Sequence, residues 1–458
     1  MTTLDERVVS VSPQNPADIV VDAPATSPAA VATSVERART AQRYWARMSP
    51  NARGLALEQF ASAVSRDQEE LAALIVREVG KPITEARGEV GRTVAILRYY
   101  AQLTLLPSGD HFREAGGGHS YTDRLPHGVA GLITPWNFPL AIPMWKAAPA
   151  LATGNTVLVK VAPEASACGL RLGELAAQCL PEDVFRVIVG GPAAGAALLN
   201  HADAISFTGS TAVGRSVTVR AAQRGVPVQA ELGGSNASII LPSADLAHAA
   251  TSIAAAATGY AGQKCTATSR IIVVQDRGRR AADALAEAWA ALAVGDPASE
   301  DTTVGPVISA RSLDRVAEAA ASSGGAVLRP APIQGEGWMA PPTLVIEPAH
   351  DAQLVREEVF GPIASVTVVP DAATAVGLVN RHPLRLVTAI YGDALSDAMT
   401  VADEVASGVV KVNRPTTGVD YWLPFGGAGG SSYGEREQGL AALDFYTTTR
   451  TVSISVRP

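Results

Sequence analysis

One cysteine in this 458-residue chain lies in a setting that favours a nucleophile. Cys265 follows Lys264 and precedes Thr266, whereas Cys168 and Cys179 lie in apolar helical patterns that are typical of structural thiols. A neighbouring cation and oriented backbone dipoles lower the pKa of a thiol and enlarge its nucleophilic thiolate fraction. The local pattern therefore predicts a catalytic role for Cys265, with a structural role as the alternative.

Two further side chains could assist such a thiol. Glu231 ends a predicted strand and precedes a glycine pair, so its carboxylate can face a cleft, and partial burial would raise its pKa into the range of a general base. A surface glutamate in a turn is the alternative. Asn137 lies between Trp136 and Phe138 with a proline on either side, and its rigid amide could donate to an oxyanion. Its alternative role is to cap the next helix.

A strand, a glycine-containing turn and a predicted helix start follow one another at residues 207–214. Gly209 allows the backbone to approach a phosphate, and the free N–H groups at the helix start favour an anion. The turn lacks the GxGxxG spacing of the common dinucleotide fingerprint. Lys160, which ends another predicted strand, and Glu358 could bond the two riboses of a dinucleotide, although a lone residue of this kind is more often a solvated charge.

Alternating strand and helix patterns must position these residues. Short apolar runs separated by helical patterns fill residues 129–231, which predicts a parallel, doubly wound sheet. A second alternation follows Cys265, so we expect two α/β domains with the active site between them. Ligands of such sheets bind at the carboxyl ends of the strands, where Asn137, Lys160 and Glu231 are expected to lie.

Helical patterns also precede the first sheet, and two strand-like pieces fit neither α/β block. The helices are expected at residues 29–47, 51–79 and 83–103, and the strand-like pieces at 119–124 and 445–456. These pieces could pair as an arm that reaches a neighbouring subunit or form a plain edge hairpin. The expected division is a dinucleotide-binding domain (1–118 and 129–231), a catalytic domain (232–430) and an arm (119–128 and 440–458).

Composition excludes several classes of protein. Hydrophobic residues make up 47% of the chain and charged residues 18%, which is typical of a globular protein. A net charge of −7 gives no electrostatic reason to bind nucleic acid or anionic lipid, and no apolar stretch could span a bilayer. The 3 cysteines, without CxxC or paired histidines, predict neither a disulfide framework nor a metal site and favour a cytoplasmic location.

Together, these motifs resemble the aldehyde dehydrogenase superfamily in order and approximate spacing, from about residue 13 to the end of the chain. The matching segments are Pro135-Trp136-Asn137-Phe138-Pro139, the strand lysine Lys160, Gly209-Ser210-Thr211-Ala212-Val213-Gly214, Glu231-Leu232-Gly233-Gly234, Gly262-Gln263-Lys264-Cys265, Glu357-Glu358-Val359-Phe360-Gly361-Pro362 and Pro424-Phe425-Gly426-Gly427. The resemblance implies a cofactor domain, a catalytic domain and a small β oligomerisation arm, usually in dimers or tetramers.

The resemblance also implies a reaction and its residues. Cys265 would attack an aldehyde, Asn137 and the Cys265 N–H would stabilise the oxyanion, and Glu231 would activate water to release a carboxylic acid. Lys146 and Glu437 match positions that the family uses in proton relay. NAD or NADP would take the hydride. Its binding residues would be Ile133, Thr134, Pro135, Trp136, Lys160, Ala162, Glu164, Gly191, Phe207, Thr208, Gly209, Ser210, Val213, Leu232, Gly233, Glu358 and Phe360.

Two departures from the family pattern matter. Many members follow the strand lysine with Pro-Ser-Glu, whereas here Glu164 stands one place later, so the choice between NAD and NADP stays open. The N-terminus is short, and the usual first strand is expected to be missing.

The substrate is inferred from segments near the C-terminus. Residues 413–418, 431–439 and 445–448 resemble the 2,5-dioxovalerate (α-ketoglutaric semialdehyde) dehydrogenase branch, whose substrate carboxylate would pair well with an arginine. The expected pocket residues are Trp145, Arg414, Thr417 and Phe425. Trp145 and Phe425 could equally line a pocket for an apolar or aromatic aldehyde.

Two rival functions share the same motifs. In a CoA-acylating semialdehyde dehydrogenase, the thioester formed on the cysteine would pass to CoA instead of being hydrolysed by water. Such relatives generally lack a glutamate where this chain has Glu231. An inactive scaffold with this fold would have lost the cysteine, the glutamate or the asparagine, and all three are present. The residues therefore favour a hydrolytic enzyme.

Overall fold

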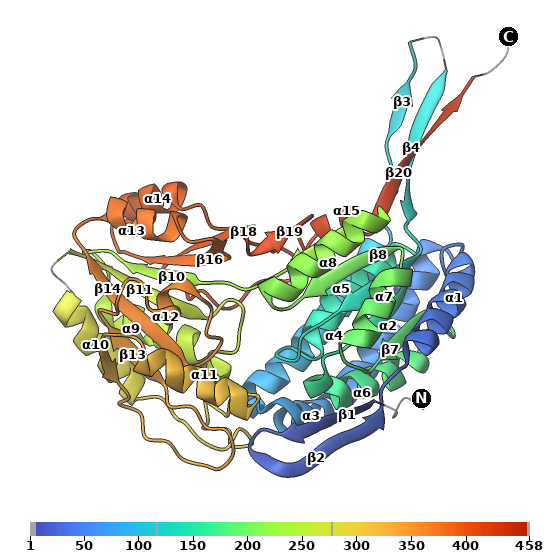
Figure 1. Ribbon diagram of the computed structural model, residues 1–458. Coiled ribbons are helices and arrows are strands. Elements are labelled where there is room, and N and C mark those ends of the chain that lie inside the picture. Colours follow the sequence, from blue (N-terminus) through green and yellow to red (C-terminus); the bar gives the residue numbers. More distant parts are fainter. Residues whose placement is uncertain (1–5, 116–117, 276–277, 456–458) are drawn as a thin grey trace.

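The computed structural model describes residues 6–115, 118–275 and 278–455. Two largely parallel sheets form its core, each covered by helices, and Figure 1 shows them as two lobes with a third, narrow sheet projecting from one lobe. The expected α/β class with two doubly wound sheets is confirmed. No helix of the described residues is long and apolar enough to cross a membrane.

The first sheet is built from residues 129–231 plus one late strand, in the order β19-β9-β8-β5-β6-β7. Its strands are β5 (Val129–Ile133), β6 (Thr156–Lys160), β7 (Phe185–Ile188), β8 (Ala204–Thr208), β9 (Val228–Glu231) and the antiparallel β19 (Ser432–Tyr433). The crossover helices are α5 (Ala141–Ala152), α6 (Ser166–Ala177), α7 (Pro192–His201) and α8 (Thr211–Arg224). From β5 the chain proceeds to β6 and β7 on one side and later to β8 and β9 on the other. The strand order therefore reverses between β5 and β8, and such a switch point is where doubly wound sheets bind ligands.

The segment before this sheet differs from expectation in two ways. The helices are α1 (Pro28–Trp45), α2 (Pro50–Arg66), α3 (Gln68–Val79) and α4 (Ile83–Leu103). The pattern over 51–79 is two helices, because Asp67 leaves helical geometry at φ −92° and ψ 12° while the apolar periodicity continues across it. The expectation of no first strand is wrong. Strands β1 (Arg7–Ser12) and β2 (Asn15–Pro24) form an antiparallel hairpin, in which alternate side chains of β1 are buried.

The second sheet has the order β12-β13-β14-β11-β10-β16-β17. Its strands are β10 (Asn236–Ile240), β11 (Thr268–Val274), β12 (Ala326–Leu328), β13 (Thr343–Ile346), β14 (Ile363–Val369), β16 (Val387–Tyr391) and β17 (Val409–Val412). Its helices are α9 (Leu246–Thr258), α10 (Gly278–Ala290), α11 (Ala310–Ala321), α12 (Gln353–Arg356), α13 (Ala372–Asn380) and α14 (Leu395–Glu404). Sequence analysis missed β10, which lies near the middle of the sheet before Cys265, because a short buried strand after a glycine pair carries no alternation.

The two leftover pieces pair as anticipated. Strand β20 (Thr447–Ile454) runs antiparallel to β4 (His119–Pro126), and the short β3 (His111–Arg113) covers the other edge of β4. Figure 1 shows this sheet extending away from both lobes. Contact of the arm with a second subunit stays a prediction. The remaining short elements are β15 (Leu384–Arg385), β18 (Ala428–Gly429) and α15 (Ala441–Phe445).

A buried carboxylate ties the N-terminal hairpin to the first lobe, and its removal should destabilise the fold. Glu78 accepts hydrogen bonds from Ser10 Oγ at 2.9 Å and from the N–H groups of Ala167 and Cys168 at 2.7 and 2.8 Å. Glu78→Ala would leave these donors without a partner, at about 1–3 kcal/mol for each buried group. We expect a lower midpoint of thermal unfolding. Glu70→Ala, on the exposed face of the same helix, is the control, and an equal midpoint for the two variants would contradict the prediction.

Candidate active site

Cys265 follows a tight loop between α9 and β11. Tyr260, Ala261 and Gly262 all have left-handed backbone conformations, with φ of 53°, 52° and 67°. A Cβ on Gly262 would lie 2.2 Å from the carbonyl oxygen of Gly361, so only glycine fits this position. The Tyr260 hydroxyl donates to the carbonyl of Val79 at 3.0 Å. This hydrogen bond holds the loop before Cys265 against the end of α3.

Asn137 joins this loop to the segment that follows β5. Its side-chain Nδ2 donates to the carbonyl oxygen of Gln263 at 2.9 Å, two residues before Cys265. The alternative role as a helix cap is wrong, because the N-terminal N–H groups of α5 at Leu140 and Ala141 donate instead to Glu89 Oε1, at 2.9 and 3.1 Å. The buried Asn137 amide makes this one side-chain hydrogen bond among the described residues, and its Oδ1 has no partner there.

Beneath Asn137 lies a buried ion pair that sequence analysis did not identify. The Lys81 ammonium pairs with Glu89 and donates to the backbone carbonyl of Asn137 at 2.8 Å. It also lies 3.8 Å from the ring centroid of Phe138 and 4.6 Å from that of Tyr260. In the sequence, Lys81 lies in Gly80-Lys81-Pro82, a pattern that indicates only the end of a helix. The pair is a positioning element for Asn137.

Glu231 is the last residue of β9, at the carboxyl edge of the first sheet, and its side chain is buried. Its Oε2 accepts from Ser432 Oγ at 2.7 Å, and a Cβ on Gly426 would lie 2.9 Å from its Oε1. Burial, with the nearby negative charge of Glu437, raises the pKa of Glu231 well above its usual range. The expected rise in pKa is thus confirmed.

The two predicted relay residues form a second buried ion pair next to Glu231. Lys146 pairs with Glu437 and donates to Ser206 Oγ at 2.8 Å. The backbone N–H groups of Phe425 and Glu437 each donate to the other's carbonyl, at 2.7 and 2.8 Å. The charge of Glu437 raises the pKa of Glu231 and that of Lys146 lowers it, so both act on the carboxylate.

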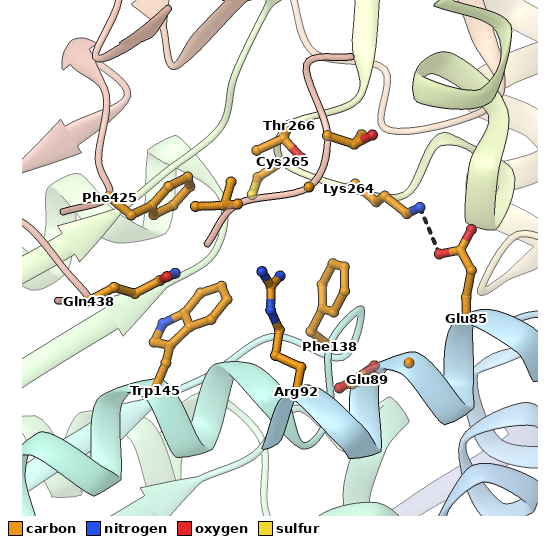
Figure 2. A pocket seen from close by; sticks show the side chains of 14 residues that line it. Glu85, Glu89, Arg92, Phe138, Trp145, Lys264, Cys265, Thr266, Phe425 and Gln438 are labelled. Carbon is orange, nitrogen blue, oxygen red and sulfur yellow. Dashed lines mark ion pairs between the residues drawn. The ribbon is translucent and has the colours of Figure 1, made fainter. Parts of the chain in front are cut away.

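The expected effect of Lys264 on the Cys265 thiol is wrong. The Lys264 ammonium pairs with Glu85 at 2.7 Å, and Figure 2 shows it directed to that carboxylate and away from the sulfur. Burial, together with the charges of Glu358 and Glu231, raises the pKa of the Cys265 thiol. The nearby carboxylates therefore outweigh a cation whose charge is already paired.

The predicted cofactor residues of the first lobe gather at the carboxyl edge of its sheet. The N–H of Thr134 donates to the carbonyl of Lys160, and the N–H of Gly209 to that of Glu231, both at 3.1 Å. Within the described residues, the buried hydroxyls of Thr134 and Thr208 have no partner, and the Lys160 ammonium group makes no hydrogen bond or ion pair. Ser210 begins α8 without a side-chain cap. Phosphate and ribose oxygens could satisfy these groups.

The other predicted cofactor residues lie around this edge. Glu358 Oε1 accepts from the N–H of Gly234 at 3.2 Å, beside Gly233 and Leu232, and burial raises the pKa of Glu358 to about 7. The ring of Phe360 meets that of Trp136 edge-on, with centroids 5.7 Å apart. The rest lie at strand ends or helix starts of the first lobe, namely Ile133, Pro135, Ala162, Glu164, Gly191, Phe207 and Val213.

A cavity of about 390 Å³ opens above Cys265 between the lobes. Figure 2 shows Trp145 and Phe425 on one side, Phe138 on the other, and the guanidinium of Arg92 directed inward. Of the predicted pocket residues, Trp145, Thr417 and Phe425 line the cavity. Arg414 is exposed and does not.

Sequence analysis missed the face that helix α4 contributes to this cavity. Glu85, Gly88, Glu89 and Arg92 all line it. Their spacing of i, i+3, i+4 and i+7 places them on one side of a helix. This polar stripe is the signal that could have identified them.

Comparison with known proteins identifies relatives over nearly the whole chain. The model of the "Aldehyde dehydrogenase family" matches residues 2–452. The chain is 36% identical to an alpha-ketoglutaric semialdehyde dehydrogenase of Bacillus subtilis (strain 168), covering 97% of this chain and 94% of that protein. A crystal structure of an NAD-dependent aldehyde dehydrogenase from Sinorhizobium meliloti matches with a TM-score of 0.94 and 32% identity, over 99% of this chain and 92% of that one. An NADP-dependent glyceraldehyde-3-phosphate dehydrogenase from Bacillus halodurans C-125, complexed with NADP, matches with a TM-score of 0.93 and 29% identity, over 99% and 96%.

Removal of the Lys81 charge should destabilise the protein strongly. Lys81→Met leaves Glu89 buried without its cation, which typically costs about 3–5 kcal/mol. Adding Glu89→Gln should recover part of the lost stability, because the neutral amide oxygen can still accept hydrogen bonds from the N–H groups at the start of α5. Urea unfolding of the single and double variants measures both effects. A double variant no more stable than Lys81→Met would show that the unpaired charge is not the cause.

The reactivity of Cys265 should depend on the protonation of Glu358. Below pH 7 this carboxyl is largely protonated, so Glu358→Gln should alkylate at the wild-type rate. Above pH 7 the carboxylate raises the pKa of the wild-type thiol, so the variant should react faster, by up to about tenfold for one pKa unit. Iodoacetamide labelling of the Cys265 peptide from pH 6 to 9 measures this. Exposed Glu357→Gln is the control, and parallel profiles would contradict the prediction.

Proposed function

The chain belongs to the aldehyde dehydrogenase family, and on this premise we propose that it oxidises an acid semialdehyde, such as 2,5-dioxovalerate, to the corresponding acid. NAD(P)-dependent oxidation of an aldehyde is the activity of the family. The observation that carries the proposal is that two buried side chains from other segments reach the loop of Cys265, which lines the cavity: Asn137 bonds the carbonyl of Gln263, and the charge of Glu231 acts on the Cys265 thiol. The relative from Bacillus subtilis supports the choice of substrate.

In the first half-reaction, the Cys265 sulfur adds to the aldehyde carbon. The thiol must first release its proton to solvent in the open cavity, and its raised pKa makes this step depend on the charges around it. Asn137, fixed by Gln263 and Lys81, donates an N–H to the oxyanion of the thiohemiacetal. Loss of such a donor typically costs about 10²–10³ in kcat. Bound NAD(P) would accept the hydride that leaves this carbon, and Cys265 then carries a thioester.

In the second half-reaction, Glu231 takes a proton from water, which attacks the thioester carbon and releases Cys265 and the acid. A buried carboxylate with a raised pKa is suited to this task. The Lys146–Glu437 pair lies next to Glu231 and can pass the proton onward. A buried base at this position favours transfer to water over transfer to CoA.

The cofactor fits the carboxyl edge of the first sheet. The start of α8 at Ser210 would bind its pyrophosphate, with Lys160 and Glu358 on its riboses. The unpartnered hydroxyls of Thr134 and Thr208 provide further bonding groups at this edge. Either NAD or NADP remains a candidate.

An apolar or aromatic aldehyde is the second candidate substrate. Phe138, Trp145 and Phe425 all line the cavity. Oxidation rates for 2,5-dioxovalerate, succinate semialdehyde, pentanal and benzaldehyde, each with NAD and with NADP, distinguish the candidates. Preference for benzaldehyde or pentanal over both semialdehydes would refute the acid semialdehyde.

We also propose the division of the chain that sequence analysis gave. The cofactor domain comprises residues 1–118 and 129–231, and the catalytic domain residues 232–430. The projecting sheet supports an oligomerisation arm at 119–128 and 440–458, with a homodimer or homotetramer as the assembly.

Glu231→Gln should separate the two half-reactions. The amide cannot accept a proton from water, so we expect rapid formation of about one equivalent of reduced cofactor, followed by slow turnover. Stopped-flow absorbance of the reduced cofactor measures both phases. Glu435→Gln, at an exposed site nearby, is the control. Wild-type steady-state turnover in Glu231→Gln would remove Glu231 from the mechanism.

A further inference from the structure

The charged groups that line the substrate cavity are paired, with one exception. Glu85 pairs with Lys264, and Glu89 pairs with the buried Lys81. Arg92 lines the same cavity and makes no hydrogen bond or ion pair with any of the described residues. The uncompensated charge of the lining is therefore positive.

The position of Arg92 directs this charge at the substrate. Arg92 lies one turn beyond Glu89 on the face of α4 that borders the cavity, and its side chain is half-buried. Figure 2 shows its guanidinium rising between Trp145 and Phe138 towards the level of Cys265. The flanking rings restrict access of water, so an ion pair here is screened less than on an open surface.

Charges of both signs surround Arg92. Burial lowers the pKa of its guanidinium, and the charges of Asp420 and Glu89 raise it. The charges of Arg92 and Arg414 both act on Lys411 and lower its pKa, whereas that of Asp420 raises it. Lys411 donates to the carbonyls of Thr417 and Gly418, at 2.7 Å each, and so holds the loop at the cavity edge. Asp420 forms no ion pair within the described residues. Arg92 is thus the cation of this group whose donors remain available inside the cavity.

We propose that Arg92 binds the carboxylate of the substrate while Cys265 attacks the aldehyde at the other end. This inference rests on the proposed function, since it assigns a residue to the acid semialdehyde's second functional group. A guanidinium offers two parallel N–H donors to a carboxylate, which gives orientation as well as affinity. A neutral aldehyde would leave those donors unpaired.

Arg414, the arginine that the sequence suggested, is a poorer anchor. Its side chain is exposed, so its charge is hydrated and screened, and it does not line the cavity. Arg92 lies in an N-terminal helix, where no local motif marks it as a pocket residue.

A comparison of two C5 aldehydes tests the assignment. In Arg92→Gln, kcat/KM for 2,5-dioxovalerate should fall by about 10- to 100-fold, the range for a lost charged hydrogen bond, and that for pentanal should stay within about twofold. Arg92→Lys keeps the positive charge but not the two parallel N–H donors, so its kcat/KM for 2,5-dioxovalerate should fall less. Arg98→Gln is the matched control, because Arg98 lies on the same helix but pairs with Glu58 at the surface. Equal losses for both aldehydes, or a loss of selectivity in Arg414→Gln instead, would overturn the assignment.

A binding measurement separates this inference from the identity of the substrate. Glutarate, a C5 dicarboxylate without an aldehyde, should protect Cys265 of the wild-type protein from iodoacetamide and should fail to protect Arg92→Gln. This result supports the carboxylate site even if 2,5-dioxovalerate proves a poor substrate. Protection of both proteins, or of neither, overturns the role of Arg92. A wild-type preference for 2,5-dioxovalerate that persists in Arg92→Gln would refute the inference while leaving the proposed function intact.

Discussion

The buried ammonium group of Lys81 is the contact on which the geometry of the active site depends. It lies between α3 and α4 and touches Glu89, the carbonyl of Asn137 and the rings of Phe138 and Tyr260. A charge in the protein interior is tolerated only where its partners are fixed around it. These contacts therefore hold the helix pair, the segment after β5 and the loop before Cys265 in one arrangement. The positions of Asn137 and Cys265 relative to each other depend on that packing.

Buried carboxylates set the electrostatics of the same site. Glu231 and Glu358 lie around the Cys265 thiol, and both raise its pKa, while Glu437 raises that of Glu231. Charge of one sign in a weakly screened interior favours the protonated forms. A positively charged ligand beside the sulfur would act in the opposite direction and favour the thiolate. Lys264 cannot do so, because Glu85 already holds its charge.

Helix α4 carries a buried structural residue and a cavity-lining residue on one face. Glu89 completes the ion pair with Lys81 and caps α5 through Leu140 and Ala141. Arg92, three residues later, extends into the cavity. Because Glu89 is fixed by several buried bonds, Arg92 extends from a rigid part of the helix. Selectivity for a carboxylate can therefore be built without a mobile loop.

Side-chain periodicity and residue type are local properties, so the alternation of elements and the α/β class could be predicted from the sequence, together with candidate roles for Cys265, Glu231 and Asn137. The sequence also placed α4 at residues 83–103, as the structure has it. The folded chain was needed to show that Lys264 pairs with Glu85, that Glu89 rather than Asn137 caps α5, and that Arg92 and not Arg414 lines the cavity. Each of those outcomes depends on which distant charges meet in a shared interior. Such meetings are fixed by how the helices and sheets pack, and no local pattern along the chain records them.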